Sequence, residues 1–310
     1  MLVWKVLADF RLKVTVQKPK IVEETDSYVE FTDGSRYHFF NRLNDLTNKE
    51  WVKFQKSWFI LNPKPRENTV LLHPAKFPEE LAGWFIEFFT KRGQTVFDPM
   101  VGTGSTLVAC LEKGRCGIGV ELLEKYAEIT VKRLEKLVSK HKNIDGENVY
   151  EVFLKVFLGD AREIDHMEIP QIDYVITSPP YWDMLVEEGF ETQKKRKEKS
   201  LDVYYSDDPR DLGNIHDYES FLDELEKIYR KVYDLLKPNG YFTVVVKNVK
   251  KKGKMYPLAW DLAKRLSKFF ALKDEKIWCQ DNIKLAPYGY GKAWVSNTVH
   301  HYCLNFKKET

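Results

Sequence analysis

The stretch TVFDPMVGTGST, residues 95–106, joins a short apolar run to a glycine-rich turn, and a helical pattern follows at once. Gly102 and Gly104 allow the backbone to turn tightly and approach a ligand, and the first N–H groups of the helix can meet polar groups. A dinucleotide fingerprint would place a third glycine at position 107, where Leu107 stands, and no GK[ST] phosphate loop follows. The turn therefore predicts a ligand site at the end of a strand, but not a phosphate site.

Outward from this turn, helical stretches alternate with short apolar runs from about residue 78 to the tail HHYCLNF at 300–306. The pattern predicts helices at 217–236 and at about 257–269, with a strand at 241–246 between them. Such alternation predicts an α/β fold: a mostly parallel sheet with helices on both faces and ligands bound beyond the carboxyl ends of the strands. The polar stretch 187–211 predicts a mobile loop.

Residues 1–70 differ in texture and predict a small β-rich N-terminal module, which leaves 71–310 as the main domain. Residues 3–16 and 28–40 are rich in β-branched and aromatic residues, and Asp33-Gly34 supplies the turn chemistry of a hairpin. The module is a candidate for substrate recognition.

A helix is predicted after these strands, because Thr47 and Glu50 match the pattern of a capping box. We expect this helix to carry Trp51, Phe54 and Trp58 at helical spacing. Their rings belong either to the core or to a surface on which bases stack.

Three predicted strands end at an acidic residue: Asp98, Glu121 and Asp160. An acidic side chain at the end of the second strand is placed to accept hydrogen bonds from both ribose hydroxyls of a nucleoside. Asp160 is placed to accept one from an adenine amino group. Three carboxylates suit a cationic nucleoside better than an anionic dinucleotide. The alternative is that they only cap the helices that follow.

The strand DYVIT at 173–177 runs directly into Ser178-Pro179-Pro180-Tyr181. Two consecutive prolines cannot continue a hydrogen-bonded ladder, and they fix a rigid turn at the carboxyl end of the strand. This turn is expected to direct Ser178 and Tyr181 into the ligand cleft, unless it serves only to end the strand.

Together the two turns resemble the signatures of the amino-methyltransferases of nucleic acids, which use S-adenosyl-L-methionine and act on cytosine N4 or adenine N6. DPMVGTGST (98–106) is similar to the family's cofactor loop, SPPY (178–181) to its catalytic turn, and HPAKFP (73–78) to an element near the methionine end of the cofactor. The resemblance covers about 71–310 and implies a Rossmann-like sheet of seven strands. The expected cofactor-binding residues are Lys76, Asp98, Pro99, Gly102, Gly104, Ser105, Thr106, Glu121 and Asp160.

The chemistry of this family accounts for the residue types of the second turn. An exocyclic amine is a poor nucleophile because its lone pair is delocalised into the ring. The Ser178 hydroxyl and, by the resemblance, the Pro179 carbonyl would accept the two N–H bonds and direct the lone pair at the methyl group. Tyr181 would stack on a base held outside its helix, as base-directed enzymes require. The catalytic residues are therefore predicted to be Ser178, Pro179, Pro180 and Tyr181.

The base is predicted to be cytosine. Serine at position 178, rather than Asp or Asn, resembles the enzymes that act on the cytosine 4-amino group more than those that act on adenine. Methylation of a ring carbon would instead need a cysteine nucleophile, preceded by proline in that family. None of the four cysteines follows a proline.

Composition limits the remaining classes. With 310 residues, 43% hydrophobic and 31% charged, the chain fits a globular protein of two domains or of one domain with an appendage. It shows no membrane span, no secretory signal, no paired cysteines and no metal-ligand spacing, so a cytoplasmic location without a metal is expected. The abundant Lys and Glu resemble a heat-adapted composition. The net charge of +3 leaves any attraction for phosphate to local clusters.

The polymer is expected to be RNA. Sequence-specific DNA members of the family usually carry an additional target-recognition domain, but at most 35 residues separate Tyr181 from the helix predicted at 217. A compact enzyme can recognise structured RNA by shape and by unstacked bases. Ribosomal RNA is the favoured target, as for an archaeal rRNA N4-cytidine methyltransferase. DNA modification at cytosine N4 or adenine N6 is the alternative.

Lysines after the strand at 241–246 are expected to contact phosphates, because they share the carboxyl-end rim with Ser178. The basic run in 187–211 is less informative, since that stretch holds six basic and eight acidic side chains. Two other classes compete with this interpretation: a methyltransferase for a protein or small molecule, and a non-catalytic binding subunit on the same fold. The predicted nucleic-acid contacts are Trp182, Lys247, Lys250, Lys251, Lys252 and Tyr288.

Overall fold

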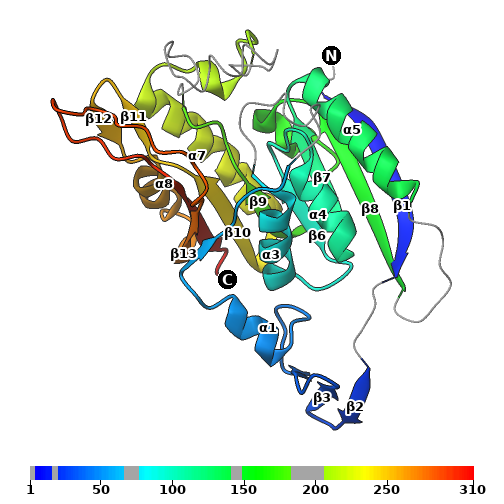
Figure 1. Cartoon of the computed structure of the whole chain (residues 1–310). Helices are drawn as coiled ribbons and strands as arrows, with labels where there is room; N and C mark the ends of the chain where they lie inside the picture. Colours follow the sequence, from blue (N-terminus) through cyan, green and yellow to red (C-terminus); the bar gives the residue numbers. More distant parts are fainter. Residues whose placement is uncertain (1–3, 16–19, 66–76, 141–148, 183–205) are drawn as a thin grey trace.

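A large open sheet with helices on both faces forms the body of the protein (Figure 1). The computed structural model describes residues 4–15, 20–65, 77–140, 149–182 and 206–310. Among these residues, the sheet has nine strands: in spatial order they are β1 (Lys5–Thr15), β8 (Val149–Leu158), β7 (Cys116–Glu121), β6 (Thr95–Asp98), β9 (Ile172–Thr177), β10 (Leu236–Val246), β14 (His300–Lys307), β13 (Ala271–Cys279) and β5 (Trp58–Ile60).

The seven strands from β8 to β13 are the predicted core. Strands β8, β7, β6, β9 and β10 run parallel, and β14 lies antiparallel between β10 and β13. The parallel strands therefore end at one edge, where the predicted ligand site lies. The Rossmann-like α/β fold with a strand-rich N-terminal region is confirmed.

The strand-rich N-terminal region does not stand wholly apart from this sheet. Strand β1 pairs antiparallel with β8 at one edge, and β5 pairs parallel with β13 at the other, so the seven predicted strands become nine. A separate three-stranded sheet is formed by β2 (Ile21–Glu24), β3 (Tyr28–Phe31) and β4 (Arg36–His38). It contains the predicted hairpin at Asp33-Gly34. The boundary at residue 70 stays a prediction.

The helix predicted after these strands is α1 (Asn48–Lys53), and its capping box is present. Trp51 and Phe54 belong to the core, because their rings lie 4.7 and 3.9 Å from that of Phe88. Trp58 corrects the prediction: it lies not on the helix but in β5, where its backbone pairs with Ile277. Pairing with the edge of the sheet overrides the helical spacing of the three aromatic residues.

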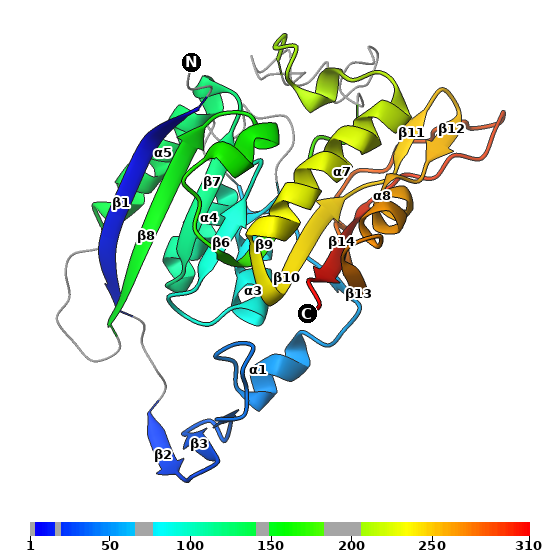
Figure 2. The ribbon, with the colours of Figure 1, turned by 180° about the vertical axis from the view of Figure 1, so that it is seen from behind.

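Two groups of helices cover the two faces of the sheet (Figures 1 and 2). Helices α3 (Glu79–Phe89), α4 (Ser105–Lys113) and α5 (Glu124–Val138) cover one face; α7 (Tyr218–Leu235), α8 (Leu258–Leu266) and the short 3-10 helix η1 (Ala161–His166) cover the other. Neighbouring strand residues alternate between the faces. Val96 packs in the apolar cluster beneath α3, α4 and α5, and Phe97 packs in the cluster beneath α7, α8 and η1. None of the described helices combines the length and apolarity that a membrane crossing needs.

Part of the stretch predicted as a mobile loop is ordered against the core. Residues 206–211 lead into the short 3-10 helix η2 (Leu212–Asn214), which Asp211 caps by accepting a hydrogen bond from the Gly213 N–H at 2.9 Å. The rest of that stretch, 187–205, lies outside the described residues. A small hairpin of β11 (Val249–Lys251) and β12 (Lys254–Tyr256) follows β10.

Candidate active site

Asp98, the last residue of β6, ties three elements together. Its Oδ1 accepts hydrogen bonds from the Thr177 hydroxyl at 2.7 Å and the Met100 N–H at 3.0 Å, and its Oδ2 accepts one from the Thr106 hydroxyl at 2.6 Å. Burial raises the pKa of Asp98 to about 6. Because Thr106 lies in the first turn of α4 and Thr177 ends β9, this carboxyl group connects the predicted cofactor loop to the predicted catalytic strand.

The glycine-rich turn approaches α5 closely at Gly104, whose φ of 85° lies in the left-handed region. A Cβ at this position would stand 2.7 Å from the Thr130 methyl carbon, so only glycine fits without a shift. Thr130 in turn donates a hydrogen bond to the Gly102 carbonyl at 2.9 Å. The Ser105 hydroxyl donates to Glu79 of α3 at 3.1 Å. Side chains of α3 and α5 thus fix the shape of the turn.

Glu121 ends β7 and holds the same turn from the other side. Its two carboxyl oxygens accept hydrogen bonds from the Gly102 N–H and the Leu123 N–H, each at 2.9 Å. The side chain is 8% exposed, and burial raises its pKa to about 8. The predicted ribose-binding residue is therefore preset by two backbone donors and faces into a pocket.

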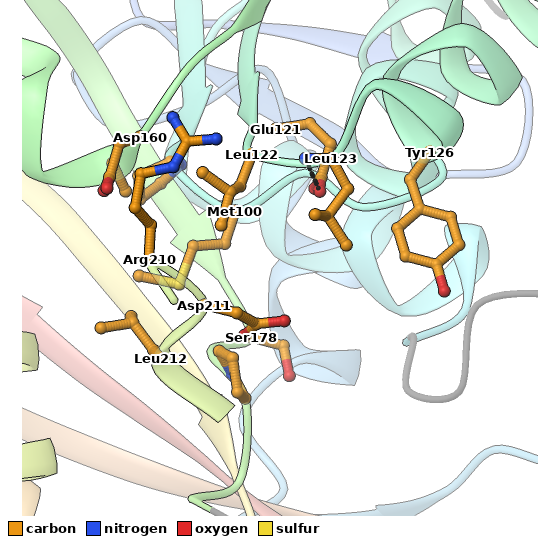
Figure 3. Close-up of a pocket in the computed structure, with 13 residues that line it drawn as sticks. Met100, Glu121, Leu122, Leu123, Tyr126, Asp160, Ser178, Arg210, Asp211 and Leu212 are labelled. Atoms are coloured by element: carbon orange, nitrogen blue, oxygen red, sulfur yellow. Dashed lines mark hydrogen bonds between the residues drawn. The ribbon is translucent and has the colours of Figure 1, made fainter. Parts of the chain in front are cut away.

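This pocket opens at the carboxyl ends of β6, β7, β8 and β9 (Figure 3). Its volume of about 630 Å³ includes the space open to solvent at its mouth. It is lined by Pro99, Met100, Glu121, Leu122, Leu123, Tyr126, Asp160, Ala161, Ser178, Pro180, Arg210, Asp211 and Leu212. Five of these residues are site residues predicted from the sequence: Pro99, Glu121, Asp160, Ser178 and Pro180. Their roles in binding and catalysis stay predictions.

One wall of the pocket is not predicted from the sequence, because residues 210–212 belong to a stretch with the composition of a loop. Arg162 attaches this wall to the fold: it pairs with Asp160 at 2.7 Å and also donates to the Arg210 carbonyl. Asp211 faces the pocket, and burial raises its pKa. The sequence marks this wall only by Asp211, a residue type that is typical of the N-cap of a helix. A helix cap does not by itself indicate a ligand.

The SPPY turn brings Ser178 and Tyr181 together at the same end of the sheet. The Ser178 Oγ lies 3.1 Å from the Tyr181 hydroxyl oxygen, and Ser178 is on the pocket wall. Tyr181 is 8% exposed, and burial raises the pKa of its hydroxyl, which therefore stays neutral. Its ring lies 6.0 Å from that of His301, which stacks on Trp278 at 4.4 Å. A neutral pair of hydroxyls thus stands beside the pocket.

Trp182, one of the predicted nucleic-acid contacts, is buried in this structure. It is 4% exposed, and its ring lies between those of Tyr218 and Tyr256, at 5.1 and 4.6 Å. The indole N–H donates to the His216 carbonyl at 3.2 Å. The backbone at Trp182 adopts a φ of 54°, in the left-handed region.

The predicted lysines gather around the β11–β12 hairpin, which begins where β10 ends. Lys247 is half-buried, and burial lowers its pKa. Lys250 donates to Ser296, and the Lys251 ammonium lies 4.5 Å from the Trp182 ring centroid. Lys252 is exposed in the turn of the hairpin. These lysines share the rim with Ser178, as expected, but two of them already have partners within the chain.

Other predicted residues have different outcomes. Asp98 and Thr106 bond to each other and do not line the pocket, which makes them positioning residues in this geometry. Lys76 lies outside the described residues, and so does most of the HPAKFP element. Tyr288 is half exposed on the loop before β14. Within the described part of the chain, no group of three or more His, Cys, Asp and Glu is placed to hold a metal ion.

The pocket fits the chemistry of S-adenosyl-L-methionine. Three carboxyl groups line it, from Glu121, Asp160 and Asp211, and they can accept hydrogen bonds from ribose hydroxyls and an amino group. Met100, Leu122 and Leu123 supply apolar surface for a flat base (Figure 3). Acceptors and apolar side chains with little positive charge suit a cationic nucleoside and disfavour a polyphosphate.

Similarity to known proteins agrees with this geometry. The chain matches the N6/N4 methyltransferase family, described as DNA methylase, over residues 10–132 and 172–310. It is 36% identical over 102 residues to the type II methyltransferase M.BglI of Bacillus subtilis, which is 32% of this chain and 28% of that protein. It is 37% identical over 115 residues to the orphan methyltransferase M.BamHII of Bacillus amyloliquefaciens, which is 36% of this chain and 42% of that protein.

The chain thus spans less than half the length of these two relatives. A solved structure from Thermus thermophilus, named as a DNA modification methylase and complexed with S-adenosyl-L-methionine, is 30% identical with a TM-score of 0.33, and the match covers 49% of this chain and 52% of that one. The two matched ranges together cover more than half of the chain. The chain therefore belongs to the N6/N4 methyltransferase family, which is described as DNA methylase.

Proposed function

We propose that the protein transfers a methyl group from S-adenosyl-L-methionine to the 4-amino group of cytosine in RNA. The observation that carries this proposal is the place of the Ser178 hydroxyl, on the wall of the pocket that Glu121 and Asp160 also line (Figure 3). A neutral hydrogen-bond acceptor beside a cofactor pocket suits an amine nucleophile. The amine donates an N–H hydrogen bond to the acceptor, and its lone pair stays available to attack the methyl group.

Two side chains are proposed to bind the cofactor, and a third is proposed to orient the amine. Glu121 is proposed to accept hydrogen bonds from the ribose hydroxyls, and Asp160 from the adenine amino group. When bound, S-adenosyl-L-methionine supplies an electrophilic methyl group. The Ser178 hydroxyl is proposed to donate a hydrogen bond to the Tyr181 oxygen, 3.1 Å away, and to accept one from an amine N–H through its own lone pairs.

Cytosine is proposed over adenine because serine stands at position 178. Serine is shorter than Asp or Asn and offers one oxygen rather than a planar group, so it bonds the amine through a single contact. The resemblance to cytosine-N4 enzymes points the same way. Methylation of adenine would overturn this assignment.

RNA is proposed as the polymer because the described chain shows no inserted recognition domain beside the catalytic turn. The 35 residues from 183 to 217 lead from that turn to α7, and the described part, 206–217, lies against the core. DNA is the second candidate. It is favoured by the description of the family and by the names of the relatives, which are type II and orphan methyltransferases.

The test is to incubate the protein with methyl-labelled S-adenosyl-L-methionine and, separately, with unmodified total RNA and genomic DNA. Digestion to nucleosides and mass spectrometry identify the labelled base. We expect label in 4-methylcytidine from RNA, loss of label with Ser178→Ala, and no loss with Ser139→Ala, which removes an exposed hydroxyl at the C-terminal end of α5. Label only in deoxycytidine would reassign the polymer, and full transfer by Ser178→Ala would remove Ser178 from the reaction.

A further inference from the structure

Two segments that are far apart in the sequence meet beside the SPPY turn. One is the β11–β12 hairpin, and the other is the loop 280–299 between β13 and β14; both views show them running side by side (Figures 1 and 2). Lys250 joins them by donating to the Ser296 carbonyl and hydroxyl at 2.6 and 2.8 Å. The hairpin reaches the catalytic turn through Tyr256, whose ring lies 4.6 Å from that of Trp182.

The loop presents aromatic side chains to solvent. Trp294 is 90% exposed, Tyr290 89% and Tyr288 50%. Rings of this size are normally buried for most of their surface, because each removes a large apolar area from water. Three of them gathered on one loop are typical of a surface that binds a partner.

The loop is closed by its own hydrogen bonds, so the backbone that carries the rings is shaped before any partner arrives. The Asn297 side chain accepts from the Ala286 N–H at 2.9 Å and donates to the Ala286 carbonyl at 2.7 Å. At the tip, the Ala293 N–H donates to the Gly289 carbonyl at 2.8 Å. A preorganised aromatic surface loses less conformational entropy on binding.

The charge around these rings is positive. The stretch 247–256 holds five lysines and no acidic residue, and the loop adds Lys284 and Lys292 against the single acid Asp281. Lys252 and Lys254 are exposed. Aromatic faces interleaved with cations are the chemistry of single-stranded nucleic acid, because bases stack on the rings while the cations meet phosphates.

We propose that this surface, the aromatic–lysine clamp (Tyr288, Tyr290, Trp294, Lys252 and Lys254), holds unpaired nucleotides of the RNA next to the target cytosine. The inference rests on the proposed function, since it names the part of the chain that presents the base to Ser178. Trp294 and Tyr290 stack on flanking bases, and the two lysines contact phosphates. Paired RNA cannot use the rings, because its bases are already stacked.

The test measures binding of a fluorescein-labelled single-stranded RNA and of the same strand annealed to its complement. We expect the wild-type protein to prefer the single strand. Trp294→Ala and Tyr290→Ala are each expected to weaken single-strand binding at least about five-fold, the lower end of what one stacking ring contributes. Leu272→Ala is the control: its side chain is apolar and 43% exposed, and it lies near the start of β13, at the edge of the sheet opposite the carboxyl ends of the parallel strands.

A second measurement separates the clamp from the proposed function and from misfolding. In steady-state methyl transfer to RNA, Trp294→Ala is expected to raise KM with kcat and S-adenosyl-L-methionine affinity unchanged. Lys252→Gln is expected to reduce the salt slope of binding by about one. If the wild-type protein methylates RNA while both ring variants bind as it does, the clamp is wrong and the function stands. If it neither binds nor methylates RNA, both are wrong.

Discussion

Replacing Glu121 by glutamine should change how the stability of the ligand-free protein depends on pH. Burial raises the pKa of this carboxyl group from 4.5 to about 8, although two backbone N–H groups favour the ionised form. A carboxyl group with a higher pKa in the folded than in the unfolded state binds its proton more tightly when folded. Its stabilising contribution is therefore complete below about pH 4.5 and is lost as the pH rises through about 8.

The size of the effect follows from linkage. Between about pH 5.5 and about pH 8.5, this one group lowers the wild-type free energy of unfolding by about 3 kcal/mol. Glutamine cannot ionise, so Glu121→Gln lacks this loss. The amide nitrogen of glutamine opposes one of the two N–H donors, but that penalty is the same at each pH and cancels in the slope. The stability difference should shift by about 3 kcal/mol in favour of the variant over this interval.

Urea unfolding of both proteins without ligand, at several pH values across the interval, measures this difference. Glu124→Gln is the matched control for the change of Glu to Gln, because Glu124 is exposed and pairs with Lys5 at the surface. Parallel stability curves for wild type and Glu121→Gln would refute the reasoning, since they would mean that Glu121 is ionised throughout. The same variant should bind S-adenosyl-L-methionine more weakly, because it offers the ribose one acceptor fewer.

Three further changes test other parts of the site. Ser178→Ala should lower kcat about a hundred-fold and leave the Kd for S-adenosyl-L-methionine, measured by calorimetry, unchanged; a matching loss of cofactor affinity would place Ser178 in binding instead. Gly104→Ala should lower the free energy of unfolding by about 2–4 kcal/mol, from left-handed strain plus the contact with Thr130. Gly93 is the control position, because its φ of 77° is similar but nothing lies within 4 Å of an added Cβ, so Gly93→Ala should lose only the strain energy. Equal losses of unfolding free energy in the two variants would contradict the close contact at Gly104. Arg162→Met should raise the Kd for S-adenosyl-L-methionine about ten-fold, equivalent to one charge-assisted hydrogen bond, because it frees the pocket wall; an unchanged Kd would show that the wall does not touch the cofactor.

Local patterns are enough to place the ends of the strands. Asp98, Glu121 and Asp160 follow apolar runs of strand length, and parallel strands bring their carboxyl ends to one edge. The helix predicted at 217–236 is found as Tyr218–Leu235, because its apolar spacing and the Asp217 cap are both local signals. The sequence is therefore enough to place a helix or strand when one short segment carries both its apolar pattern and the residue that begins or ends it.

The parts missed depend on contacts between distant segments. Trp58 is drawn into the sheet by β13, about 220 residues later, and no local pattern records that pairing. Arg210 lies on the pocket wall, where Arg162, 48 residues earlier, donates a hydrogen bond to its carbonyl. Trp182, a predicted nucleic-acid contact, packs against Tyr218 and Tyr256, which lie far from it in the sequence. Composition showed aromatic residues near 288, but only the fold shows that Tyr290 and Trp294 face solvent.

The two edges of the sheet have a consequence for how the chain folds during synthesis. The strand at Lys5–Thr15 pairs with one made about 150 residues later, and the strand at Trp58–Ile60 waits for one about 220 residues later. Until then both emerge from the ribosome with unpaired backbone groups, which can pair with other chains. Such high contact order slows folding. Both strands therefore wait a long time for their partners, and aggregation during expression should depend on how well these two strands are protected.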